Sequence, residues 1–210
     1  MTDNFDLSIY FVADPACCKG RAIFDVVLEA AEAGVTMVQY RDKSGDMPLI
    51  SANAAMLAQL LKPFGIPLLV NDHVDIAFAA GADGVHIGQG DCDPAEARKT
   101  LGEDAIIGLT AFNEDQISAV DPEIIDYIGT GPVHPTQTDK GKPVLGVDGF
   151  AELCALSPVR VVGIGGITPE NAAPVLQAGA DGVAMMRSIS EASDISEAVK
   201  AFQTNMKVAA

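Results

Sequence analysis

The chain has 210 residues, a hydrophobic share of 49% and a formal net charge of -16 at pH 7. This length and hydrophobic share suit one folded domain with a buried core and exclude a disordered chain. The acidic charge argues against nucleic acid as a general partner, and the apolar runs are too short to span a membrane. Because residues 1–6 also lack the basic region of a signal peptide, we expect a cytoplasmic protein.

Strand and helix signals alternate along the whole chain. Short apolar and β-branched runs predict strands over residues 7–13, 36–41, 67–72, 84–88, 105–110 and 127–133, with two more inside 161–171 and 180–190. Apolar residues at helical spacing predict helices over 24–33, 48–61, 74–80, 93–101 and 114–120, a helix ending at 155, and a closing helix over 191–206. Such alternation indicates a parallel sheet. Eight strand–helix units in this length predict an α/β fold, a single (β/α)8 TIM barrel over residues 1–210, rather than an open doubly wound sheet.

Two stretches near the C-terminal end predict a phosphate site. In the first, an apolar run stops at Gly165-Gly166, and Thr168-Pro169 predicts a helix start with Thr168 as the N-cap. The second, residues 180–190, likewise passes from an apolar strand through a polar turn into a helix. Free backbone N–H groups at such turns bind anions, and the last two loops of a TIM barrel frequently do so. The alternative is a pair of ordinary turns whose glycines serve tight geometry.

The predicted second strand ends in Gln39-Tyr40-Arg41-Asp42-Lys43. Because side chains alternate along a strand, Gln39, Arg41 and Lys43 point in one direction. Two cations and an amide aimed together suit a diphosphate, with the guanidinium binding two oxygens and the ammonium acting as a point charge. A solvated surface rim is the alternative.

The next two predicted strands each end near a carboxylate, Asp72 after the third strand and Asp91 after the fourth. Neighbouring parallel strands end at the same rim, so both carboxylates should lie beside the cations of the second strand. Paired oxygen ligands, with no cysteines at a metal-ligand spacing, fit Mg2+ held partly through substrate phosphate. An acid–base pair is a competing role, which the neighbouring cations disfavour. Thr110 adds a hydroxyl donor at the end of the fifth strand.

The longest polar connection, residues 131–143, follows the sixth strand and carries two threonines, a histidine and two lysines. Long loops in compact barrels tend to be functional, and the glycines of this one would let it close over a substrate. His134 invites an acid–base role, but a lone loop histidine is more often a packing or rim residue. His73 and His86 have a weaker claim to such a role.

Five motifs recur in order at the predicted strand ends: Gln39-x-Arg41-x-Lys43, Asn71-Asp72, Gly84-Val85-His86-Ile87-Gly88-Gln89-x-Asp91, Gly131-Pro132 with Pro135-Thr136-x-Thr138, and Gly163-Ile164-Gly165-Gly166-Ile167. In this order the chain resembles thiamine phosphate synthases. Each motif alone is a weak signal, but five at matching strand ends are specific. The resemblance runs from the first predicted strand to the last helix.

This resemblance implies an enzyme of thiamine biosynthesis that joins hydroxymethylpyrimidine diphosphate to hydroxyethylthiazole phosphate, releasing pyrophosphate. In that family the diphosphate leaves first and the thiazole nitrogen then attacks a pyrimidine cation, so no protein nucleophile is needed. The partners are these two small molecules, without nucleic acid or membrane, and a homo-oligomer stays open. By position, the resemblance assigns the pyrimidine diphosphate to Gln39, Tyr40, Arg41, Asp42, Lys43, Asn71, Thr110 and Lys140, the thiazole phosphate to Thr136, Gln137, Thr138, Gly166, Met186 and Arg187, and Mg2+ to Asp72 and Asp91.

The chain departs from the family pattern at three positions. Asp139 stands where the family usually has lysine, and Lys140 follows it; Gly90 replaces an acidic residue. Arg187 stands where the family usually has serine. Its guanidinium either contacts the thiazole phosphate or points outward, and we favour the outward orientation because family members function with serine.

Two other functions remain as rivals to the coupling reaction. A thiazole tautomerase would share the barrel and the thiazole phosphate site, but it needs neither the cations of strand two nor the paired aspartates. A sensor that binds thiamine phosphate without turnover would be explained by the changes at Asp139 and Arg187.

Overall fold

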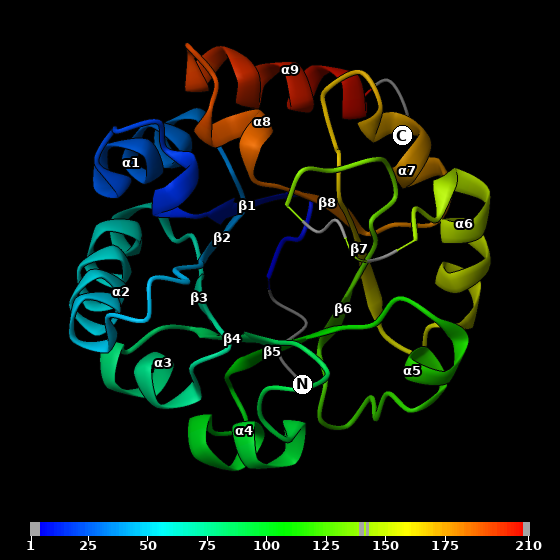
Figure 1. Cartoon of the computed structure of the whole chain (residues 1–210), viewed down its shortest axis with the longest axis horizontal. Coiled ribbons are helices and arrows are strands. Elements are labelled where there is room, and N and C mark those ends of the chain that lie inside the picture. Colours follow the sequence, from blue (N-terminus) through cyan, green and yellow to red (C-terminus); the bar gives the residue numbers. More distant parts are fainter. Residues whose placement is uncertain (1–4, 139–140, 142, 208–210) are drawn as a thin grey trace.

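The computed structural model describes residues 5–138, 141 and 143–207. Its strands form a closed barrel in sequence order, each parallel to its neighbours, and β8 pairs with β1 to complete the circle (Figure 1). The TIM-barrel prediction is therefore confirmed. The strands are β1 (Ile9–Ala13), β2 (Met37–Tyr40), β3 (Leu68–Asn71), β4 (Gly84–Ile87), β5 (Ile106–Thr110), β6 (Tyr127–Thr130), β7 (Arg160–Ile164) and β8 (Gly182–Met185).

Helices surround the barrel, and the last of them packs across both α1 and α7 (Figure 1). The helices are α1 (Ile23–Ala33), α2 (Met47–Leu61), α3 (Val74–Ala80), α4 (Pro94–Leu101), α5 (Glu114–Ser118), α6 (Gly146–Leu156), α7 (Ala172–Gln177), α8 (Arg187–Ser190) and α9 (Ile195–Lys207), with short 3-10 turns at Pro15–Cys17 and Lys62–Phe64. Because α9 touches the first and the seventh units, it holds the two ends of the chain together.

Side-chain alternation along the strands divides the buried residues into two cores. The larger core lies between the strands and the helices. The smaller core fills the barrel interior and includes two tyrosines among apolar residues: Leu7, Tyr10, Val12, Met37, Leu69, Ile106, Tyr127, Val162 and Ala184. Hydroxyl groups inside the barrel need hydrogen-bond partners there, because an unpaired buried polar group is unfavourable.

A repeated hydrogen-bond pair ties the strands together in twos at the amino-terminal rim. In each pair, one residue stands just before an even-numbered strand and the other lies on the preceding odd-numbered strand. The first donates its backbone N–H to the backbone carbonyl of the second, and its side chain accepts the backbone N–H of the second. The four side-chain acceptors, with their distances to the strand N–H, are Thr36 to Ile9 (2.9 Å), Asp83 to Leu68 (2.8 Å), Asp126 to Ile107 (2.7 Å) and Asp181 to Val161 (2.7 Å). Short polar residues are therefore needed at these positions.

Two helix predictions near the C-terminal end are wrong. The helix after β7 begins at Ala172, not after Thr168, because the Asn171 side chain accepts the N–H of Thr168 (2.8 Å) and donates to the carbonyl of Gly166 (2.9 Å). These bonds hold the intervening residues as a turn. The closing helix, predicted over residues 191–206, begins at Ile195, four residues later than expected, and Asp194 accepts the N–H of Glu197 (2.8 Å) at its start. Glu191 instead ends the separate short helix α8.

Candidate active site

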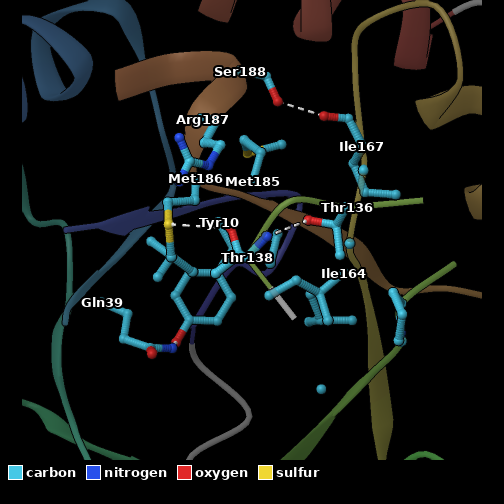
Figure 2. Close-up of a pocket in the computed structure, with 18 of the residues that line it drawn as sticks. Tyr10, Gln39, Thr136, Thr138, Ile164, Ile167, Met185, Met186, Arg187 and Ser188 are labelled. Atoms are coloured by element: carbon cyan, nitrogen blue, oxygen red, sulfur yellow. Dashed lines mark hydrogen bonds between the residues drawn. The ribbon is translucent and has the colours of Figure 1, made fainter. Parts of the chain in front are cut away.

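A cavity of about 700 Å³ opens where the strands end at their carboxyl termini. Residues from both halves of the predicted site line it, including Gln39 on β2 and Arg187 on α8 (Figure 2). The predicted residues that the structure brings together here are Gln39, Arg41, Asn71, Thr110, Thr136, Gln137, Thr138, Gly166, Met186 and Arg187. This is the location expected for a TIM-barrel active site.

The end of β2 divides its side chains between the barrel interior and the surrounding helices. Gln39 and Arg41 face the cavity, and Arg41 forms an ion pair with the buried Asp14. Tyr40 lies on the opposite side of the strand, where its hydroxyl donates to Asp42 (3.0 Å) and accepts from Asn53 (3.1 Å). Although burial raises the pKa of Asp42, hydrogen bonds from Ser44 and from the Tyr40 hydroxyl bring it below its usual value. Tyr40 and Asp42 thus lie outside the cavity that holds their neighbours.

The two predicted metal ligands share a second cavity of about 480 Å³, which also contains His73 and Asp75. Asp72 forms an ion pair with Lys43, and its left-handed backbone (φ 64°) turns the chain at the end of β3. Asp91 accepts the N–H of Gly88 through Oδ2 (2.7 Å). Within the described residues, the Oδ1 atom of neither aspartate takes part in a hydrogen bond or an ion pair.

This arrangement fits Mg2+ better than a metal that needs a full set of protein ligands. No group of three or more His, Cys, Asp or Glu side chains able to hold a metal occurs among the described residues. Mg2+ is commonly bound by one or two carboxylates, with substrate phosphate and water completing its coordination. The two free carboxylate oxygens match that requirement.

The loop after β6 and the turn after β7 contact each other at Gly166. The φ of Gly166 is 63°, and a Cβ added there would lie 2.5 Å from the carbonyl oxygen of Pro135. Only glycine fits this left-handed, crowded position. Opposite the turn, the Thr138 hydroxyl lies 4.0 Å from the sulfur of Met186 (Figure 2). Asp139 and Lys140, which the sequence placed next in this loop, lie outside the described residues.

The turns after β7 and β8 expose several backbone donors. Within the described part of the chain, the N–H groups of Gly166, Ile167, Arg187 and Ser188 donate no hydrogen bond. The hydroxyl of Ser188 donates to the carbonyl of Ile167 and joins the two turns (Figure 2). The turns therefore have the free donors expected of an anion site.

Arg187 lines the cavity and is held by an acidic neighbour one helical turn away. Its Nη1 forms an ion pair with Glu191, and its side chain is 40% exposed. Lys19 also approaches Glu191, with its Nζ 3.5 Å from the carboxylate and 3.1 Å from the backbone carbonyl. A guanidinium in this position is available to the cavity, which does not support the outward orientation favoured from the sequence.

Several residues that line the cavity were not assigned a role from the sequence. Tyr10, His86 and Tyr127 project into it from β1, β4 and β6. The alternation of β1 and β6 predicts inward tyrosines, which was the available signal for them. His134, which the sequence analysis considered more often a packing or rim residue than an acid–base group, does not line the cavity, and its Nε2 is buried without a hydrogen-bond partner among the described residues.

Comparison with known proteins adds evidence independent of this geometry. The family model described as thiamine monophosphate synthase matches residues 9–189. The chain is 44% identical over 206 residues to the thiamine-phosphate synthase of Azorhizobium caulinodans and 42% identical over 205 residues to that of Xanthobacter autotrophicus, covering 97% of each chain in both pairs. Its fold is similar to the solved thiamine phosphate pyrophosphorylase from Pyrococcus furiosus, with a TM-score of 0.86, 28% identity, and coverage of 97% and 96% of the two chains. A 3-hexulose-6-phosphate synthase, 17% identical with a TM-score of 0.69, shares the fold.

Over its described residues, this chain has no helix with the length and hydropathy needed to cross a membrane.

Proposed function

The chain belongs to the thiamine monophosphate synthase family, and we propose that the cavity at its barrel mouth is where it performs the coupling reaction. The enzyme is a transferase that joins hydroxymethylpyrimidine diphosphate to hydroxyethylthiazole phosphate. The bond between the pyrimidine methylene carbon and the diphosphate oxygen breaks, and its electron pair leaves on pyrophosphate. The lone pair of the thiazole nitrogen forms the new carbon–nitrogen bond. The observation that carries this proposal is that residues from both predicted half-sites line one cavity.

In this proposal the pyrimidine diphosphate binds at the ends of β2 to β5. Arg41 binds diphosphate oxygens, and its ion pair with Asp14 orients the guanidinium before the substrate arrives. Asn71 and Thr110 supply an amide and a hydroxyl to the same side of the cavity. Lys43 reaches the diphosphate from the neighbouring rim once the phosphate competes with Asp72 for its ammonium group. Tyr40 and Asp42 support this end of β2 from outside the cavity.

Asp72 and Asp91 would hold Mg2+, since the protein contacts of each carboxylate leave one oxygen free among the described residues. When bound, the metal neutralises charge that develops on the leaving diphosphate. Asp91 is positioned for this by the N–H of Gly88, and Asp72 by the turn that ends β3. The enzyme depends on Mg2+ for the rate of coupling, not for its fold, because both carboxylates lie at strand ends outside the buried core.

The thiazole phosphate binds on the opposite side, at the turns after β7 and β8. Free N–H groups of Gly166 and Ile167 donate to phosphate oxygens, as do those of Arg187 and Ser188. Thr136 and Thr138 approach from the loop after β6 and help to close the cavity against water. The thiazole nitrogen then faces the pyrimidine methylene carbon across the cavity, so that the two substrates react without a protein nucleophile. The cytoplasmic location stays a prediction from the sequence, which left a homo-oligomer open.

The experiment that tests this function measures pyrophosphate and thiamine phosphate together. Purified protein is incubated with both substrates and Mg2+, and in control reactions one substrate is left out. We expect both products in equal amounts and only when both substrates are present. A protein that isomerises the thiazole carboxylate precursor but makes no pyrophosphate would be a tautomerase. Tight binding of thiamine phosphate without any coupling would identify a sensor.

A further inference from the structure

We propose that a chain of hydrogen bonds across the barrel interior fixes the direction in which Thr110 presents its hydroxyl to the cavity. Tyr10, Tyr127 and His86 are the positioning residues of this chain. The inference about substrate rests on the proposed function, which places the pyrimidine diphosphate at the side of the cavity that Thr110 lines. The inference about proton positions concerns the protein alone.

The hydrogen-bond chain runs without a gap from Gln39 on β2 to Thr110 on β5. Gln39 Nε2 donates to the Tyr10 hydroxyl (2.7 Å), and the Tyr10 and Tyr127 hydroxyl oxygens lie 2.8 Å apart. The Tyr127 hydroxyl lies 2.9 Å from His86 Nδ1, and His86 Nε2 lies 3.0 Å from Thr110 Oγ1. All four distances are those of ordinary hydrogen bonds. Five side chains from five different strands are thus connected through the centre of the barrel.

Both tyrosines keep their protons. Tyr10 and Tyr127 are 1% and 0% exposed, and burial raises the pKa of each phenol well above its usual value. A neutral phenol has one proton to donate, and its oxygen can accept another. Each tyrosine therefore passes on the direction of the hydrogen bond that it receives.

The amide of Gln39 sets that direction. Because its NH2 group donates to Tyr10, the Tyr10 proton is free to donate to Tyr127, and the Tyr127 proton to His86 Nδ1. The opposite direction would leave the buried Tyr10 proton without an acceptor among the described residues, which is unfavourable. His86 Nδ1 is then the acceptor, so the neutral ring carries its proton on Nε2 and donates to Thr110. The proton of Thr110 is left to point into the cavity, toward an acceptor on the substrate.

Glycines in two strands make the room that this chain occupies. A Cβ added at Gly108 of β5 would lie 2.2 Å from the Tyr127 ring, and one at Gly129 of β6 would lie 3.1 Å from the His86 ring. Glycine weakens a strand unless something approaches its backbone closely. Here the approaching groups are the rings of Tyr127 and His86, the two middle members of the hydrogen-bond chain. Both glycines are therefore needed for these rings to fit inside the barrel.

The first test determines the tautomer of His86 in the ligand-free protein. Protein labelled with [15N]histidine is examined by NMR at a pH where imidazoles are neutral, and His86→Gln identifies which of the three histidine signals belong to His86. We expect a pyridine-type Nδ1 and a pyrrole-type Nε2. Tyr10→Phe, which removes a hydroxyl bonded to Tyr127 but not to His86, should shift His86 toward a mixture of tautomers, and Tyr127→Phe should do the same.

Tyr40→Phe is the matched control, because Tyr40 is also a buried tyrosine whose hydroxyl forms a hydrogen bond, but it is not part of the hydrogen-bond chain that reaches Thr110. It should leave the His86 tautomer unchanged. Wild-type protein with the proton on Nδ1, or folded Tyr10→Phe and Tyr127→Phe variants with the wild-type tautomer, would overturn the proposal. Circular dichroism establishes that the variants are folded.

The second test connects the chain to the substrate. Tyr10→Phe should impair use of the pyrimidine diphosphate about threefold to tenfold, the contribution of one hydrogen bond, and should leave the Michaelis constant for the thiazole phosphate unchanged. An equal effect on both substrates would contradict a role at Thr110. If the wild-type protein shows no coupling at all, the proposed function fails, while the NMR result still decides whether the hydrogen-bond chain is directed.

Discussion

Replacing Arg187 with serine tests whether its guanidinium contributes to phosphate binding. The side chain lines the cavity beside free backbone donors, so its loss should weaken binding of the thiazole phosphate. A charge-assisted hydrogen bond contributes about 1.5–3 kcal/mol when it is shielded from water. Arg187 is 40% exposed and already paired with Glu191, so we expect a contribution at or below the lower limit of this range, about 1–1.5 kcal/mol, or roughly a fivefold to tenfold rise in the Michaelis constant.

The assay measures the Michaelis constant for the thiazole phosphate at saturating pyrimidine diphosphate. Glu191→Gln is the matched variant, because it keeps the size of the side chain but removes the competing negative charge. It should lower that constant by about twofold to threefold, the opposite sign to Arg187→Ser. An unchanged constant in Arg187→Ser would mean that the backbone donors bind the phosphate alone, and the reasoning about the guanidinium would be refuted.

Three further predictions concern the metal, a buried ion pair and the thiol of Cys154. Asp72→Asn and Asp91→Asn should each raise the Mg2+ concentration for half-maximal rate by about tenfold or more without changing the circular dichroism spectrum; a normal Mg2+ dependence would remove the residue from the metal site. Arg98→Met leaves the buried Asp126 unpaired and should lower the free energy of unfolding by about 3–5 kcal/mol in urea titrations, with a smaller loss when Asp126→Asn is added. Burial raises the pKa of the Cys154 thiol from 9.0 to about 12, so the unfolded chain loses this proton first and stability should fall as pH rises from about 9 toward 12. Cys154→Ala should reduce that fall; an identical pH profile would contradict it.

The barrel and the location of the site could be predicted from the sequence because both depend on local patterns. Apolar runs that alternate with helical periods fix the strand order of a parallel barrel, and polar residues after each run identify its carboxyl rim. Arg41 and Thr138 were found in this way, although they are distant in the sequence. Asp72 and Asp91 were likewise brought to a shared cavity by the ends of β3 and β4.

Features that depend on side chains from several strands could not be predicted in this way. The hydrogen bonds of His86 join it to Tyr127 on β6 and Thr110 on β5, and they depend on the register of three neighbouring strands, which the local sequence pattern does not contain. Similarly, Asn171 delays the start of α7 through bonds to the preceding turn, whereas Thr168-Pro169 alone predicts an earlier start. The pairing of Glu191 with Arg187 was not predicted either, because the closing helix was expected to begin at Glu191, which left Arg187 in the turn before it.

The division of the cavity into two substrate halves is the central claim, and one set of kinetic constants tests it most directly. The Michaelis constants for both substrates are measured in Arg41→Lys, which keeps the charge beside Asp14 but loses the forked donor, and in Thr138→Val. We predict that Arg41→Lys raises only the constant for the pyrimidine diphosphate, by about tenfold, and that Thr138→Val raises only the constant for the thiazole phosphate, by about threefold to tenfold. If both variants affected the same substrate, or each affected both equally, the two-half arrangement would be contradicted.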